Sequence, residues 1–226
     1  MKDSFLIRIV LVIKITMISV NVCSQSISLI QCPDNNHPHA IDLGLESGTK
    51  WSCCNLDASN PFDNGGYYAW GETTNKEEYS LLTYSYCRKD GWGDYHYIDV
   101  ASDSLNIINT SYDVVHKKMG NGWRMPSKDD ISELCRYCRK RVIVLNGVFG
   151  CLFIGKNNNK VFLPAAGFKK DKKGGRSNCG FYWTGTNELT AFDGRRPCDF
   201  YFDEDKVNCD DHGYQYSGGT IRPVLK

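Results

Sequence analysis

"GNGWRMPSKDD", residues 120–130, marks the passage from a strand into a helix. Pro126 precedes Ser127, and Asp130 follows three residues later. That spacing is typical of a helix N-cap with a capping-box partner. Apolar or sulfur-containing residues then recur at helical spacing, at Ile131, Leu134, Cys135, Cys138 and Val142. The stretch predicts a helix over 127–140 with one buried face.

Arg124 places a charge between two large apolar residues, Trp123 and Met125. We expect it on a short strand before the helix, with its guanidinium buried against backbone carbonyls or a carboxylate, because a buried arginine has to be paired. Trp123 and Met125 then flank it on the other face. An arginine that binds an external anion is the alternative. Arg222, in "TIRPV", receives the same structural interpretation.

Length and composition indicate one β-rich domain. The chain has 226 residues, 12% of them aromatic, with 21 glycines and few long helical patterns. A short helix is predicted over 111–120, with Gly120 just past its end. Short strands follow the main helix, so these patterns favour a β-rich fold over a helical bundle. The net charge of +1 argues against a nucleic-acid binder.

The N-terminal segment differs from the rest of the chain. Residues 1–24 combine an early lysine, an apolar run and small polar residues, which predicts a signal peptide, and the mature chain would start at Gln25. Residues 25–39 are interpreted as a linker and 40–226 as the domain. We therefore expect a secreted, periplasmic or cell-surface protein with no membrane span in the mature chain. A lipid anchor at Cys23 and a short membrane anchor are the alternatives.

Of the eleven cysteines, one is Cys23 in the expected signal peptide, which leaves ten, and an even number in an exported protein suggests disulfides. Cys135 and Cys138 form a C-x-x-C inside the predicted helix. We interpret them as buried helix-face residues, one of them bridged to a neighbouring strand, rather than as a redox pair or half a zinc site. Cys53 and Cys54 are adjacent and should point to opposite faces, one into the core.

The remaining metal-ligand residue types form no persuasive motif. The histidines are scattered, at positions 37, 39, 96, 116 and 212, and the first two fall in the expected linker. The acidic residues of 203–211 could bind calcium, but a solvated turn between two strands is the preferred interpretation. We therefore predict no metal, no cofactor and no catalytic residue.

Residues 184–216 place aromatic side chains between polar ones, a composition suited to recognition. Phe200 and Phe202 alternate with Asp199 and Tyr201, so we expect the first pair in the core and the second pair exposed. The predicted ligand-binding residues are Asp199, Tyr201, Asn208, Asp210, His212, Tyr214 and Tyr216.

Six phrases occur in a definite order: "DLGLESGTKW", "GGYYAWGE", "GNGWRMPSKDDISEL", "FLPAAGF", "GFYWTGT" and "GGTIRPV". Together they resemble the Fibrobacter major paralogous domain family of Bacteroidetes, from about Ala40 to Lys226. The resemblance implies a compact α+β domain of C-type lectin-like fold, with small twisted antiparallel sheets and first and last strands that meet. It also implies that the region of 184–216 forms the ligand face.

These observations predict an exported, non-catalytic module that binds a glycan or protein through 184–216 and the loop at 87–111. A structural or adhesin-tip subunit of the cell envelope is the alternative. The superfold also contains the formylglycine-generating enzymes, but their late cysteine motif is not found here, so we do not carry that activity over.

Overall fold

The computed structural model describes residues 30, 32–34, 36–97, 106–171, 176–191 and 194–226. The chain divides into Met1–Gln31 and a compact unit, Cys32–Lys226, and only the second is described here. Its elements are β1 (Ala40–Asp42), β2 (Lys50–Ser52), β3 (Cys87–Lys89), β4 (Tyr95–Tyr97), α2 (Val114–Met119), β5 (Trp123–Arg124), α3 (Lys128–Tyr137), β6 (Arg139–Leu145), β7 (Val148–Ile154), β8 (Lys160–Pro164), β9 (Gly180–Thr190), β10 (Gly194–Phe202), β11 (Val207–His212) and β12 (Val224–Leu225). The predicted signal peptide lies outside the described residues.

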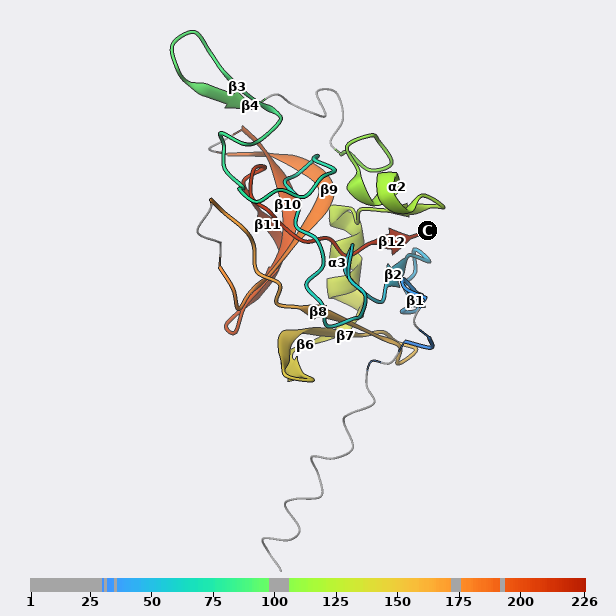
Figure 1. The fold of residues 1–226 in the computed structure, drawn as a ribbon. Coiled ribbons are helices and arrows are strands. Elements are labelled where there is room, and N and C mark those ends of the chain that lie inside the picture. Colours follow the sequence, from blue (N-terminus) through green and yellow to red (C-terminus); the bar gives the residue numbers. More distant parts are fainter. Residues whose placement is uncertain (1–29, 31, 35, 98–105, 172–175, 192–193) are drawn as a thin grey trace, which may run out of the picture. The chain divides into compact units, whose positions relative to one another are not determined.

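The strands form small antiparallel sheets, as the resemblance implies (Figure 1). Their orders are β1-β2-β12-β5, β11-β10-β9, β6-β7-β8 and the hairpin β3-β4. In the first sheet Val224 of β12 pairs with Trp51 on one side and with Arg124 on the other. The last strand of the chain therefore lies between β2 and β5 and closes the sheet that the first strand begins.

The main helix begins as predicted but ends earlier. The Ser127 hydroxyl accepts a hydrogen bond from the Asp130 backbone N–H, and the Asp130 carboxylate accepts one from the Ser127 N–H, which completes the capping box. The helix ends at Tyr137 rather than near Lys140, because the chain turns extended at Cys138 and enters β6. The predicted short helix is also present, as α2, and Gly120 forms its C-cap.

Arg124 is paired internally. Its Nη1 atom lies 2.7 Å from Asp130 Oδ2 and 2.9 Å from the carbonyl oxygen of Met125. Arg222 is fully buried and donates to Asn55 Oδ1 at 2.8 Å and to the carbonyl oxygens of Ser52 and Phe162 at 3.1 and 2.7 Å. Both arginines thus serve the fold, although the acceptors of Arg222 are neutral oxygens.

Strands β9 and β10 are covered on both faces, and this overturns one expectation. Tyr182, Phe200 and Phe202 pack into one apolar cluster with α3, whereas Phe181, Trp183 and Tyr201 pack into a second cluster with α2. The prediction that Asp199 and Tyr201 point to solvent is therefore wrong. Asp199 is 1% exposed and Tyr201 8%. The alternation of side chains is present, but both faces of this strand pair are buried.

A disulfide joins Cys135 of α3 to Cys209 of β11. It confirms that one of the two C-x-x-C cysteines is bridged to a neighbouring strand. Cys138 is buried with a free thiol, but it is the C-cap of α3 and not a residue of the helix face. Within the described residues, no helix combines the length and the apolar character that a membrane span requires.

Candidate functional site

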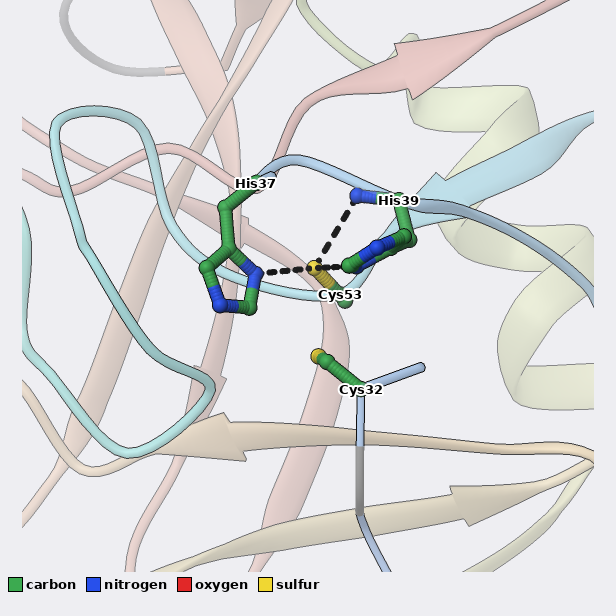
Figure 2. Close-up of side chains that lie close together, drawn as sticks. All are labelled: Cys32, His37, His39 and Cys53. Atoms are coloured by element: carbon green, nitrogen blue, oxygen red, sulfur yellow. Dashed lines mark hydrogen bonds between the residues drawn. The ribbon is translucent and has the colours of Figure 1, made fainter. Parts of the chain in front are cut away.

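Strand pairing brings two histidines of the expected linker against a cysteine beyond β2. Ala40 lies opposite Ser52 in the β1–β2 ladder, and the Cys53 N–H donates to the carbonyl oxygen of His39 at 2.9 Å, so the pairing extends by one residue. Directly opposed residues of an antiparallel pair share a face. Figure 2 shows the rings of His37 and His39 on either side of the Cys53 sulfur, with Cys32 nearby.

The distances among these four residues, here called the N-terminal cluster, suit tetrahedral coordination. His37 Nδ1 lies 3.3 Å and His39 Nδ1 3.6 Å from Cys53 Sγ. One ligand atom from each of the four residues can be chosen so that all lie within 4.8 Å of one another. A tetrahedral zinc ion, with bonds of about 2.3 Å to sulfur and about 2.0–2.1 Å to nitrogen, separates such atoms by about 3.6 Å.

The His39 ring is oriented from behind by a carboxylate. Its Nε2 atom lies 3.0 Å from Asp34 Oδ1, which leaves Nδ1 facing Cys53. A carboxylate on the outer nitrogen is the usual partner of a metal-binding histidine, because it fixes both the tautomer and the ring orientation. Asp34 is itself held locally, since its Oδ1 accepts from the Asn36 backbone N–H at 2.6 Å.

The cluster favours one thiolate, that of Cys53. A hydrogen bond with Cys54 lowers the pKa of Cys53 to about 4, against the opposing effect of burial and with further hydrogen bonds from His37 and His39. Burial and the neighbouring charge of Cys53 raise the pKa of Cys32 to about 12. A hydrogen bond with Cys53 and burial raise the pKa of Cys54, and the positive charge of Arg222 offsets only part of this increase. In this cluster, therefore, the environment stabilises the Cys53 sulfur as an anion and leaves the other thiols protonated.

A pocket of about 300 Å³ adjoins the cluster. It is lined by His37, Pro38, Cys54, Asp57 and Lys118, among others. Because His37 lines this pocket, one ligand of the cluster can be reached from a hollow in the surface, which is the entry path that a metal site needs.

A second group, here called the sheet cluster, joins Glu188, Cys198, Asp210 and His212 on β9, β10 and β11. Here a protein cation is already in place. Lys128 Nζ lies 2.7 Å from Glu188 Oε2 and 3.0 Å from Asp210 Oδ1. Burial opposes its charge, but the hydrogen bonds to the two carboxylates prevail and raise the pKa of Lys128. The ammonium group thus neutralises the carboxylates that a metal ion would need.

Two tyrosines beyond β11 form what we call the aromatic surface. The rings of Tyr214 and Tyr216 stack at 5.4 Å and an interplanar angle of 23°. The guanidinium carbon of Arg196 lies 4.3 Å from the Tyr214 ring centre, and Lys170 Nζ lies 6.0 Å from it. Tyr214 is 46% exposed. The stack fixes the orientation of an exposed ring.

The seven predicted ligand-binding residues therefore do not form a single site. Asp199 is buried without a hydrogen-bond partner for its carboxylate, and burial raises its pKa well above the usual range. The Tyr201 hydroxyl donates to Asp203 Oδ2 at 2.9 Å. Asp210 and His212 belong to the sheet cluster, and the two remaining tyrosines to the aromatic surface.

The last of the seven, Asn208, is half-buried, and its Oδ1 accepts from the Asp210 N–H at 3.1 Å. In the adjoining acidic segment, Asp203 Oδ1 accepts from the backbone N–H groups of Asp205 and Lys206, both at 3.1 Å. That arrangement is a β-turn between β10 and β11, which agrees with the preferred interpretation of 203–211. The loop predicted at 87–111 contains the β3–β4 hairpin, and its residues 98–105 lie outside the described part.

The N-terminal cluster was not predicted from the sequence, because its members come from two separate segments of the chain. The spacing Cys32-x4-His37-x-His39 just before a strand was an available signal. Only the strand register adds Cys53 to it. No family model, curated protein or solved structure matches this chain.

Proposed function

We propose that this chain is an exported, non-catalytic binding module of C-type lectin-like fold, which recognises a glycan or protein ligand through the aromatic surface. The observation that supports this most is the exposed ring of Tyr214, which stacks on the half-buried Tyr216 and lies against Arg196. Stacked aromatic rings offer flat apolar area, while the phenol hydroxyls and the guanidinium offer hydrogen bonds at its edges. Such a mixture suits the alternating apolar and hydroxyl-bearing faces of a sugar.

The loop that carries the two tyrosines is held firmly, which favours binding. The Trp70 N–H donates to the Gln215 carbonyl at 2.8 Å, and Tyr68 and Gly219 exchange backbone hydrogen bonds of 2.9 and 3.0 Å. A Cβ atom at Gly219 would lie 2.7 Å from the Phe181 ring, so only glycine lets the loop pack this closely. A surface that is already ordered loses less conformational entropy when a ligand binds.

The resemblance to the Fibrobacter major paralogous domain family supports the same proposal. The six phrases that carry it span nearly the whole compact unit. That resemblance implies first and last strands that meet, and β12 pairs with β2 next to β1. It also implies a ligand face within 184–216, the segment in which Tyr214 and Tyr216 lie.

A glycan array probed with the chain from Gln25, once with calcium and once with EDTA, tests the proposal. We expect hits that persist in EDTA, because the acidic turn already uses its Asp203 carboxylate internally. Tyr214→Ala should weaken a hit about tenfold or more, as loss of a central tyrosine commonly does. Tyr137→Ala is the matched control, since Tyr137 is also 46% exposed and also contacts an arginine. Equal loss in both variants would contradict the assignment of the surface.

A further inference from the structure

We propose that Cys32, His37, His39 and Cys53 bind a zinc ion, which fastens the segment before β1 to the residues that follow β2. The four side chains converge on one point from two stretches of chain (Figure 2). None of the predictions from sequence placed a metal here, and the site is independent of the proposed ligand surface.

The donor set selects the ion. Two thiolates and two imidazoles in tetrahedral arrangement are the preferred surroundings of zinc, whereas calcium and magnesium require oxygen ligands. Four protein ligands leave no open coordination position, so the site is structural rather than catalytic. Asp34 supplies the outer hydrogen bond on His39, as expected for a metal-binding histidine.

A disulfide between Cys32 and Cys53 is the main competitor in an exported protein. It would use two of the four side chains and would leave unexplained why both histidine rings approach the Cys53 sulfur. His37 and His39 would then lie beside a disulfide with no polar partner there for Nδ1. A zinc ion uses all four groups at once, and this is why we favour it.

Zinc would close a loop between the start of the compact unit and its first hairpin. Cys32 lies in a stretch without regular structure, and Cys53 follows β2 directly. Because a formed site exists only in the folded chain, the free energy of zinc binding adds to the free energy of folding. The ion would hold residues 32–39, the last part of the expected linker, against the domain.

The first experiment measures zinc by elemental analysis in the full chain, produced in an exporting host so that any leader is removed. We expect about one zinc ion per chain in the unaltered protein and in Cys198→Ser, and a loss in Cys53→Ser. Cys198 is the matched control, because it is a buried free cysteine of the sheet cluster.

Cobalt substitution provides the second readout. Cobalt(II) in the unaltered protein should show tetrahedral visible absorption and a thiolate-to-cobalt band in the ultraviolet, and Cys32→Ser should reduce that band by about half. Should Cys53→Ser fail to fold, Asp34→Ala keeps the test valid, since Asp34 is exposed and outside the strands. It should weaken zinc binding about 10–100-fold.

Two results would overturn the proposal. One is a Cys32–Cys53 disulfide found by mass spectrometry in protein exported and purified with zinc present. The other is zinc content that stays the same in Cys53→Ser and Asp34→Ala while circular dichroism shows both to be folded. Neither result bears on ligand binding at Tyr214, so the two proposals fail separately.

Discussion

The N-terminal cluster and the sheet cluster contain similar donors at similar spacing, yet they differ in what balances their charge. Each contains cysteine and histidine donors, and the sheet cluster adds carboxylates. In each cluster the ligand atoms lie within 4.8 Å of one another. In the sheet cluster Lys128 inserts its ammonium group between two carboxylates. In the N-terminal cluster the hydrogen bonds of the two histidines connect them to Cys53 and Asp34.

The ring nitrogens of the histidines also have different contacts in the two clusters. His39 Nε2 contacts Asp34, and His39 Nδ1 faces the Cys53 sulfur. In the sheet cluster, His212 Nε2 lies 3.4 Å from Glu188 Oε2 and 3.6 Å from Cys198 Sγ, so the carboxylate and the sulfur share one nitrogen. Residue types and distances alone therefore do not distinguish a metal site from an ion-pair network. The position of the nearest protein cation does.

The largest expected effect is that of zinc on stability. When free zinc exceeds its dissociation constant a thousandfold, ligand linkage adds about 4 kcal/mol to the free energy of unfolding. Urea unfolding followed by tryptophan fluorescence, with zinc and then with EDTA, measures the difference. Cys53→Ser should unfold alike in both solutions. A stability gain with zinc that persists in Cys53→Ser would place the effect elsewhere.

A medium effect is expected from removing the ammonium group of the sheet cluster. Lys128→Met leaves Glu188 and Asp210 without their cation, and a zinc ion can then take its place beside His212 and Cys198. We expect a second, weaker equivalent of zinc in titration calorimetry, which the further change Glu188→Gln should abolish. Should Lys128→Met still bind a single equivalent, the lysine would not be what distinguishes the two clusters.

The smallest effect is the pH dependence of the sheet cluster. The hydrogen bond from Lys128 lowers the pKa of Glu188, against the opposing effect of burial. A carboxyl group whose pKa is lower in the folded chain stabilises the folded state at pH values above its pKa in the unfolded chain, near 4.5. That stability is lost as the pH falls through the pKa of the folded chain. The pair is partly exposed, so solvent screening limits the contribution to about 1 kcal/mol or less.

Glu188→Gln should therefore flatten the acid side of the stability curve, measured by urea unfolding between neutral and acid pH. The same flattening should follow at high salt in the unaltered protein, because salt screens exposed pairs. Zinc-dependent stability should respond far less to salt, since it rests on coordination bonds. Equal salt sensitivity of both contributions would remove this distinction between the clusters.

Several features could be predicted because they depend on residues close together in the chain. The capping box joins Ser127 to Asp130, and the guanidinium of Arg124 reaches the same carboxylate from six residues away. The helical spacing that placed Cys135 on a buried face likewise needs only one helix turn, and the disulfide to β11 is consistent with it. Local hydrogen bonding and periodicity were sufficient in these cases.

Other features required the packed chain. The alternation in β10 correctly separated Phe200 from Tyr201, but it could not show that a second apolar cluster covers the other face and buries Asp199. Whether a strand has a wet face depends on what packs against it, and those residues are distant in sequence.

The start of the main helix, and the pairing of Arg124 on the strand before it, could be read from the residues alone, because each depends on contacts over a few residues. Which distant polar side chains meet depends on the packed chain. The register of β1 on β2 brings His39 to Cys53, and the docking of α3 beside β9 and β11 brings Lys128 to Glu188 and Asp210. Such meetings depend on strand pairing and side-chain packing between segments far apart in the chain, which local patterns do not encode.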